Sequence, residues 1–273
     1  MPSMHEFRTD DGIRIPYARS GGRSGLPLIL VHGFTDSWRS FEGVMARLPG
    51  HLPVVAPTLR GHGAADRPAG PYDVPALAGD VLALMDALAI ERALLVGHSM
   101  GAAVSLRVAA DHPDRVAGLA LLGGFATLAG NSAAEELRDA VDGLSDPIDP
   151  AFARAFQQGT LARPVDGRFL DMVVGESLLV PAFVWKATLA GLFATDTALA
   201  RIAAPATLLW GDRDGMFARA GQEALAAALP DARLVVFDRS GHGLHWEDPV
   251  RTAAELARIH ARIAAGAARR RAS

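Results

Sequence analysis

Short apolar runs alternate with longer amphipathic segments along most of the chain, which predicts a parallel sheet with helices on both faces, an α/β class. The runs have the length and continuous apolarity of strands that are buried on both sides. They occupy residues 28–31, 53–57, 94–96, 116–122, 207–210 and 233–237. Helices are predicted between and after them, over residues 38–48, 74–88, 100–110, 217–229 and 249–264. Residues 5–19 precede this pattern as a predicted hairpin that turns at Asp10-Asp11-Gly12.

The alternation stops between residues 125 and 200, where helical segments follow one another without a strand-like run. Proline turn signals divide this stretch, at Asp146-Pro147, Asp149-Pro150, Arg163-Pro164 and Val180-Pro181. A plain crossover between two strands needs far fewer residues, so a helical cap over the sheet edge is the better interpretation. The predicted organisation is a core of residues 1–124 and 201–273 with a cap of residues 125–200 inserted in it.

Composition narrows the chemistry further. Half of the 273 residues are hydrophobic, and 21% are charged, with a net charge of −3. No bulk attraction to nucleic acid or to an anionic membrane follows from that charge, so neither partner is expected. The absence of cysteine excludes disulfides, thiolate metal sites and cysteine nucleophiles. Lys186 is the one lysine, and its neighbours do not form the Gly-Lys-Ser/Thr of a phosphate loop.

The hydropathy profile favours a cytoplasmic protein. Residues 1–10 lack the apolar segment of a secretory signal, and no run of 18 or more uncharged apolar residues follows. The expected partner is a small molecule, and the oligomeric state cannot be inferred from these features.

The strongest chemical signal is Gly97-His98-Ser99-Met100-Gly101, placed between an apolar strand and a predicted helix. A nucleophile elbow needs this context, because a serine in a sharp strand-to-helix turn requires small neighbours two positions away on each side. The helix behind the serine directs its N–H groups and positive dipole end toward the hydroxyl. A dinucleotide loop would need three glycines spaced G-x-G-x-x-G, and the middle glycine is missing here.

A serine hydroxyl needs a base and an acid that orients the base. His242 is the predicted base, because it stands between two glycines directly after the last strand; His245 is its local competitor. His98 adjoins the serine but is expected to point away from it. The predicted acid is Asp214, in the loop after the run 207–210, with Asp212 as the alternative. A zinc site is not expected, since no His-Glu-x-x-His occurs.

An oxyanion hole completes this set. His32-Gly33-Phe34 follows the first buried run, and glycine there lets the backbone approach a substrate closely. The backbone amides of Phe34 and Met100 are the predicted donors, and one such donor contributes about 3–4 kcal/mol to transition-state stabilisation.

With these motifs the chain resembles the α/β-hydrolase superfamily, in particular its capped esterase-like and lipase-like members, over about residues 7–260. The resemblance implies Ser99 as nucleophile, Asp214 as acid and His242 as base, in the Ser…Asp…His order of that fold. It also implies an eight-stranded, mostly parallel sheet flanked by helices, with a helical cap inserted after the sixth strand. No metal or organic cofactor is implied.

The chain departs from the family pattern at two places. Many relatives carry Asp-x-Arg-Gly-x-Gly after the fourth strand, whereas Thr58 stands here in place of the aspartate, two residues before Arg60. The partner of Arg60 therefore stays open. Some relatives place the acid after the sixth strand, but Gly123-Gly124 stand there, which favours Asp214.

The predicted function is hydrolysis of a small to medium apolar carboxylic ester or lactone through an acyl-enzyme. The alternatives are a carbon–carbon bond hydrolase or a cofactor-free perhydrolase with the same triad, and a non-catalytic binder of the same fold. Ser99 argues against dehalogenases and epoxide hydrolases, whose nucleophile is aspartate. Candidate residues of an apolar substrate pocket are Trp38, Phe125, Phe156, Leu179, Trp185, Phe217 and Leu244.

Overall fold

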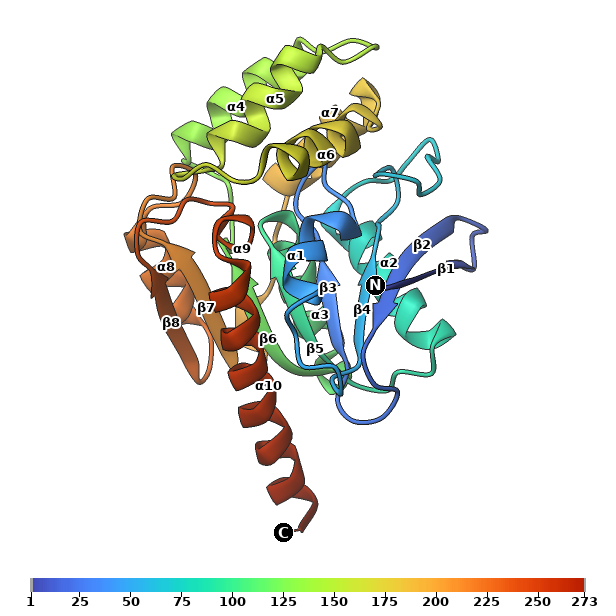
Figure 1. Ribbon diagram of the computed structural model, residues 1–273, viewed down its shortest axis with the longest axis vertical. Coiled ribbons are helices and arrows are strands. Elements are labelled where there is room, and N and C mark those ends of the chain that lie inside the picture. Colours follow the sequence, from blue (N-terminus) through green and yellow to red (C-terminus); the bar gives the residue numbers. More distant parts are fainter. Residues whose placement is uncertain (1, 273) are drawn as a thin grey trace.

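An eight-stranded sheet forms the centre of the computed structural model, which describes residues 2–272, with the backbone alone for residues 267–272 (Figure 1). The spatial order of the strands is β1-β2-β4-β3-β5-β6-β7-β8. β1 and β2 pair in antiparallel fashion with their neighbours, and the other strands pair in parallel, as predicted. The strands are β1 (Ser3–Arg8), β2 (Arg14–Ser20), β3 (Leu28–Val31), β4 (Val54–Pro57), β5 (Ala93–His98), β6 (Val116–Leu122), β7 (Ala206–Gly211) and β8 (Ala232–Phe237).

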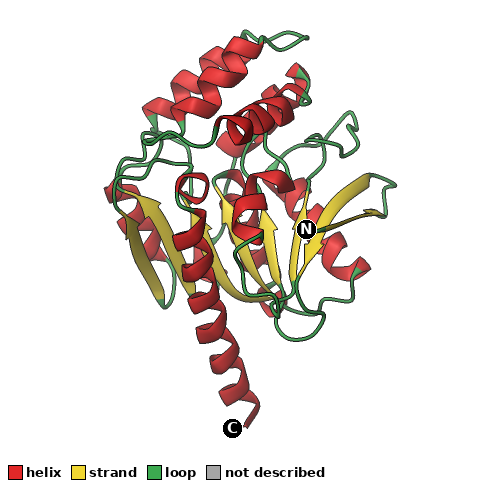
Figure 2. Cartoon of the chain, viewed as in Figure 1, coloured by secondary structure: helices red, strands yellow, loops and turns green. Residues whose placement is uncertain are grey.

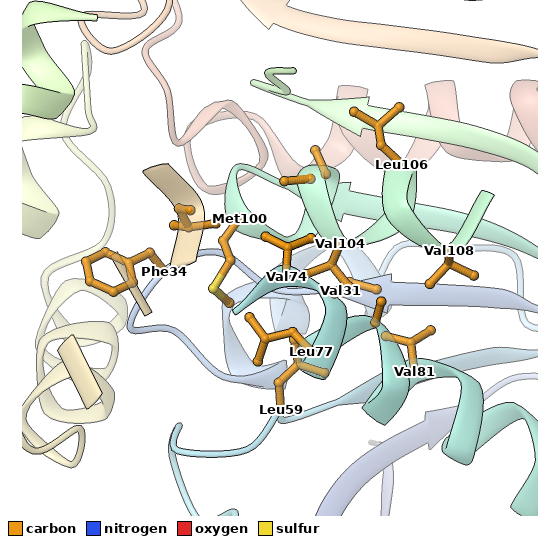
Figure 3. Close-up of a cluster of buried hydrophobic side chains, with 14 of the residues drawn as sticks. Val31, Phe34, Leu59, Val74, Leu77, Val81, Met100, Val104, Leu106 and Val108 are labelled. Atoms are coloured by element: carbon orange, nitrogen blue, oxygen red, sulfur yellow. The ribbon is translucent and has the colours of Figure 1, made fainter. Parts of the chain in front are cut away.

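Burial explains why the central runs are apolar throughout. Every residue of β3, β5, β6 and β7 is buried, since helices cover both faces of these parallel strands (Figure 2). On one face lie α2 (Val74–Ala87), α3 (Met100–Asp111) and α8 (Arg219–Ala228). On the other lie α1 (Glu42–Met45), α9 (Leu244–Glu247) and α10 (Pro249–Ala272). Figure 3 shows part of the first layer, where Val31 of β3 lies among Leu77 and Val81 of α2 and Met100 and Val104 of α3.

Two predicted helices differ from those observed. The segment 38–48 is not one helix but a 3-10 turn, Trp38–Phe41, followed by the single turn of α1. Phe41 and Met45 are nevertheless buried. The apolar periodicity therefore predicted correctly which side chains are buried, but the prediction of one continuous helix was wrong. The last helix continues to Ala272, beyond the predicted end at 264. The short helix α9 was not predicted at all.

Four α-helices occupy the stretch between β6 and β7 and lie above the carboxyl ends of the strands (Figure 1). These cap helices are α4 (Ser132–Asp142), α5 (Pro150–Gly159), α6 (Gly167–Leu178) and α7 (Ala182–Phe193). Three of them begin where a side chain accepts a hydrogen bond from the first turn, namely at Asn131, Asp149 and Asp166. The helical content agrees with the sequence, while the division into two domains stays a prediction.

Within the described chain, no single helix is long and apolar enough to cross a membrane. The helices α6 and α7 would pass such a test as a pair only, and they are bent against each other by 92°.

The partner of Arg60 is Asp80, which lies on α2 and which the sequence did not reveal. Arg60 Nη2 lies 2.6 Å and Nε 3.0 Å from Asp80 Oδ1, and the Arg60 backbone N–H donates to Asp80 Oδ2 over 3.1 Å. Asp80 is fully buried and Arg60 nearly so. Thr58, at the position where relatives carry an acid, instead accepts a hydrogen bond from the Trp38 backbone N–H. Asp80 therefore compensates the buried guanidinium from another element.

Replacing Asp80 by alanine should lower the free energy of unfolding by about 3 kcal/mol, because Arg60 would stay buried with only the largely exposed Asp11, 3.7 Å from its Nη2, as a counter-charge. Urea denaturation measures this loss. Asp86→Ala is the matched control on the same helix: Asp86 pairs with Arg115 at 2.7 Å, but its side chain is 67% exposed, so a change below about 1 kcal/mol is expected. Equal effects of the two substitutions would contradict a structural role for the buried pair.

Candidate active site

Ser99 lies in a strained turn between β5 and α3. Its φ of 51° is in the left-handed region that side chains normally avoid. Its backbone N–H donates to the Leu122 carbonyl over 2.9 Å, which ties the turn to β6. A Cβ on Gly97 would lie 2.2 Å from the Gly101 carbonyl oxygen, and one on Gly101 would lie 2.1 Å from that of Val31. Both glycines are therefore required by close backbone contact, as the elbow motif predicts.

Asp214 and His242 form a buried pair beside this turn. His242 Nδ1 lies 2.9 Å from Asp214 Oδ2, and the Asp214 side chain is fully buried. Asp214 Oδ1 accepts from the backbone N–H groups of Met216 and Phe217, at 2.8 and 3.0 Å. These two hydrogen bonds to Oδ1 fix the orientation of the carboxylate. Its other oxygen, Oδ2, accepts the Nδ1 proton of His242. The Nε2 atom of His242 is then left as the acceptor.

The electrostatics agree with an ionised Asp214. Burial by itself would raise the pKa of this carboxyl, but the charge of His242 and the hydrogen bonds from His242, Phe217 and Met216 outweigh burial and lower the pKa below its ordinary value. Asp212, the alternative acid, is exposed. The geometry thus favours Asp214 over Asp212.

His98 and His245 are packed behind the pair. His98 Nε2 donates to the backbone carbonyl of His242 over 3.2 Å, and its Nδ1 lies 3.8 Å from Asp36 Oδ2. The sequence did not reveal this contact, since it predicted only that His98 points away from Ser99. The ring of His245 lies 4.3 Å from that of His98, and burial lowers the pKa of both. His245 contacts no carboxylate among the described residues, which favours His242 over His245 as the base.

The two predicted oxyanion donors come from the start of α3 and from the turn after β3. Met100 is the first residue of α3, and the first N–H groups of a helix have no partner within that helix. Phe34 follows β3 in a turn that the Asp36 N–H closes on the Gly33 carbonyl over 3.2 Å. His32 also contacts that carbonyl through Nδ1, at 2.8 Å, and accepts the Leu59 N–H. The position of Phe34 is thus supported by the core, while its role stays a prediction.

A cavity of about 50 Å³ lies between the sheet edge and the cap helices, with Ser99 and His242 in its wall. The rest of its wall is mostly apolar. It is lined by Phe34, Asp36, His98, Phe125, Leu128, Ala134, Leu137, Phe156, Gln157, Thr160, Leu189, Leu192, Met216, Phe217 and Trp246. Three of the predicted pocket residues are among them: Phe125, Phe156 and Phe217.

Four predicted pocket residues do not line this cavity. Trp185 is fully buried behind it, with its ring edge-on to Phe34 and Phe156 at 5.1 and 5.3 Å. Leu244 and Trp38 pack in the other core layer, under α10. Leu179 is 50% exposed on the outer side of the cap helices. Three of these side chains pack in the protein core and the fourth is exposed to solvent. An apolar residue type alone does not show whether a side chain faces the core, the solvent or a substrate cavity.

A buried polar cluster joins the cap helices to the turn that carries Phe34. Gln157 of α5 donates through Nε2 to Asp36 Oδ1 and to Ser177 Oγ, at 3.1 and 2.8 Å. Ser177 of α6 lies 3.0 Å from Thr35 by their hydroxyl oxygens. All four side chains are at most 2% exposed. No sequence motif marked this cluster, because its members come from three separate segments.

In the described residues, no group of three or more histidine, aspartate or glutamate side chains is arranged to hold a metal ion.

Comparison with known proteins places this site in context. A family model described as the alpha/beta hydrolase family matches residues 28–255. The pimeloyl-[acyl-carrier protein] methyl ester esterase of Neisseria meningitidis is 32% identical over 229 residues, which cover 78% of this chain and 85% of that protein. An uncharacterized protein of Mycobacterium tuberculosis is 28% identical, with 92% of this chain and 79% of that protein covered.

A solved structure gives the same picture. An esterase from Rhodococcus sp. ECU1013 has a TM-score of 0.83 and 28% identity, with 95% of this chain and 98% of that chain covered.

The buried histidines should make the fold sensitive to acid. Burial lowers the pKa of His62 from 6.5 to about 4, although its hydrogen bond to the Arg60 carbonyl opposes this shift. Between these two values the unfolded chain binds a proton that the folded chain does not, so stability falls as the pH is lowered. At about 1.4 kcal/mol per pKa unit, His62 alone contributes a loss of about 3 kcal/mol between pH 6.5 and 4.

Denaturation curves at a series of pH values test this expectation. His62→Asn should show a shallower dependence than the unsubstituted protein, whereas His51→Asn, at an exposed position, should keep the full dependence. A wild-type free energy of unfolding that stays flat from pH 6.5 to 4 would exclude buried neutral histidines.

Gly123 leaves room for His242 and should not tolerate a side chain. Its φ is 52°, and a Cβ there would lie 2.7 Å from His242 Nδ1. Gly123→Ala should therefore separate His242 from Asp214 and remove the low-field Nδ1 proton signal of that pair in NMR spectra. Gly130→Ala is the control, because Gly130 also has a positive φ, of 73°, but nothing lies within 4 Å of its Cβ position. Persistence of the signal in Gly123→Ala would show that the pair accommodates the methyl group.

Proposed function

The chain belongs to the alpha/beta hydrolase family, and we propose that it is a serine hydrolase of carboxylic esters, acting on small to medium apolar esters or lactones. In this proposal Ser99 is the nucleophile, His242 the base and Asp214 the acid. The observation that carries the proposal is the buried Asp214–His242 hydrogen bond of 2.9 Å, next to a cavity whose wall contains both Ser99 and His242.

The first half of the reaction forms an acyl-enzyme. His242 Nε2 takes the hydroxyl proton as Ser99 Oγ attacks the ester carbonyl carbon. Asp214 holds the Nδ1 proton and stabilises the imidazolium that results. The amides of Phe34 and Met100 donate to the oxyanion of the tetrahedral intermediate. When this intermediate collapses, the alcohol leaves with the proton that His242 returns.

The second half regenerates the enzyme. A water molecule gives a proton to His242 and attacks the acyl carbonyl carbon, and Ser99 Oγ leaves and recovers the proton. The electron pairs and protons of both halves are carried by the substrate, water and the chain's own residues.

The cavity supports an apolar substrate of limited size. Its lining is dominated by phenylalanine and leucine side chains from the loops after β3, β6 and β7 and from the cap helices. A volume of about 50 Å³ has room for only a few water molecules, each of which needs about 10–15 Å³ on this measure. Short acyl chains fit this form best. The esterase names of the relatives in Neisseria and Rhodococcus favour an ester over other acyl compounds.

A series of p-nitrophenyl esters tests the substrate class. We expect turnover of the acetate and butyrate, and slower turnover of the octanoate because of the cavity volume. Ser99→Ala should lower kcat by on the order of 10⁶-fold. A fluorophosphonate should label the unsubstituted protein at Ser99, as located by mass spectrometry. Ser132→Ala, on the cap helix α4, is the control and should keep both activity and labelling.

The alternatives give different results. Labelling of Ser99 without turnover of any ester or lactone would overturn the ester assignment and favour a carbon–carbon bond hydrolase or a perhydrolase. A folded protein that is neither labelled nor active would favour a non-catalytic binder. Full activity in Ser99→Ala would refute the nucleophile.

A further inference from the structure

The turn after β3 has an unusual residue at its third position. The turn spans Gly33 to Asp36, and Thr35 has a φ of 64°. Turns with a positive φ at this position favour glycine or asparagine, because a side chain there meets the backbone. A β-branched residue is the least suited to this conformation, which persists only where the surrounding structure holds it. Thr35 is fully buried, so its surroundings are protein.

The groups that hold Thr35 come from the cap helices. Ser177 Oγ donates its single proton to the Val173 carbonyl of its own helix over 3.1 Å. In its other hydrogen bonds the Ser177 hydroxyl can therefore only accept. It then accepts from the Thr35 hydroxyl at 3.0 Å and from Gln157 Nε2 at 2.8 Å. The second Nε2 proton of Gln157 goes to Asp36 Oδ1 at 3.1 Å. Gln157 Nε2 also lies 3.4 Å from Thr35 Oγ1, a longer contact than its other two, so the amide group contacts Thr35 directly as well as through Ser177.

We propose that Ser177 and Gln157 are positioning residues, which hold Thr35 in its left-handed conformation and so direct the neighbouring Phe34 amide toward the reacting carbonyl. This inference rests on the proposed function, in which that amide is an oxyanion donor. The cap helices then contribute to the rate of the reaction as well as covering the cavity. Ser177 itself does not line the cavity, so its effect reaches the substrate through Thr35.

The simpler interpretation is that Ser177 and Gln157 only fill space under the cap helices. Buried polar side chains cost free energy unless they are hydrogen-bonded, and apolar residues would fill the same space without that requirement. The hydrogen bonds of Gln157 go to the turn and to Ser177 rather than to its own helix. Their convergence on Thr35 and Asp36 indicates a function in shaping the turn.

Ester kinetics of single and double variants test the proposal. Ser177→Ala should lower kcat for p-nitrophenyl butyrate about tenfold and leave KM within about twofold, since the substrate contacts are intact. Glycine adopts a positive φ without strain, so Thr35→Gly no longer needs Ser177. Ser177→Ala should therefore cause little further loss in the Thr35→Gly background. Thr195→Val is the control, because Thr195 follows the end of α7 and its hydroxyl donates to the Gly191 carbonyl of that helix, so kcat should not change.

Hydrogen exchange of the peptide that contains residues 33–36 provides a readout that does not depend on activity. Ser177→Ala should speed exchange of the Asp36 amide, which closes the turn, and Thr195→Val should not. A loss of kcat that is the same in both backgrounds, or an unchanged kcat and exchange rate in Ser177→Ala, would overturn the inference. If the unsubstituted protein cleaves no ester, the proposed function fails, and the exchange experiment still decides whether Ser177 holds the turn.

Discussion

The candidate site depends on close contact between three backbone segments, which leave no space for a side chain between them. The ends of β3 and β5 and the start of α3 meet at Gly97 and Gly101, where a methyl group would come within about 2 Å of a carbonyl oxygen. At this contact Ser99 adopts a positive φ of 51°, and it lies in the wall of the cavity at the sheet edge. The neighbouring strands of a parallel sheet end at the same edge, so the loops with Asp214 and Phe34 arrive beside it.

The parts of the candidate site that could be predicted from the sequence are those whose requirement is local. The elbow is defined by glycines two residues from a serine, and the positions of Asp214 and His242 follow from loops directly after strands. The sequence could not show that Asp80 pairs with Arg60, or that Gln157 and Ser177 reach the turn at Thr35. In each of these cases the partners are brought together by the packing of separate helices, and no spacing along the chain records that packing.

The pocket was harder to predict for a related reason. Residues such as Leu189 and Trp185 lie on the same cap helix, α7, and both are buried, but one lines the cavity and the other packs behind its wall. The helix is apolar on most of its surface, so periodicity does not identify the side that meets a ligand. Leu244 shows that closeness in sequence is no better guide. It is two residues from His242, but its side chain belongs to the core beneath α10 rather than to the cavity wall.

The pair of His242 and Asp214 is held by the core, through the His98 hydrogen bond to the His242 carbonyl and the amides that bind Asp214. Most of the cavity wall instead comes from the separate stretch of chain between β6 and β7. In the proposed mechanism, proton transfer and substrate choice are therefore encoded in different segments and can diverge independently in evolution. Under the proposal for Ser177 and Gln157, the cluster at Thr35 is the exception, because a change in a cap helix there would alter the position of the Phe34 amide as well as the cavity wall.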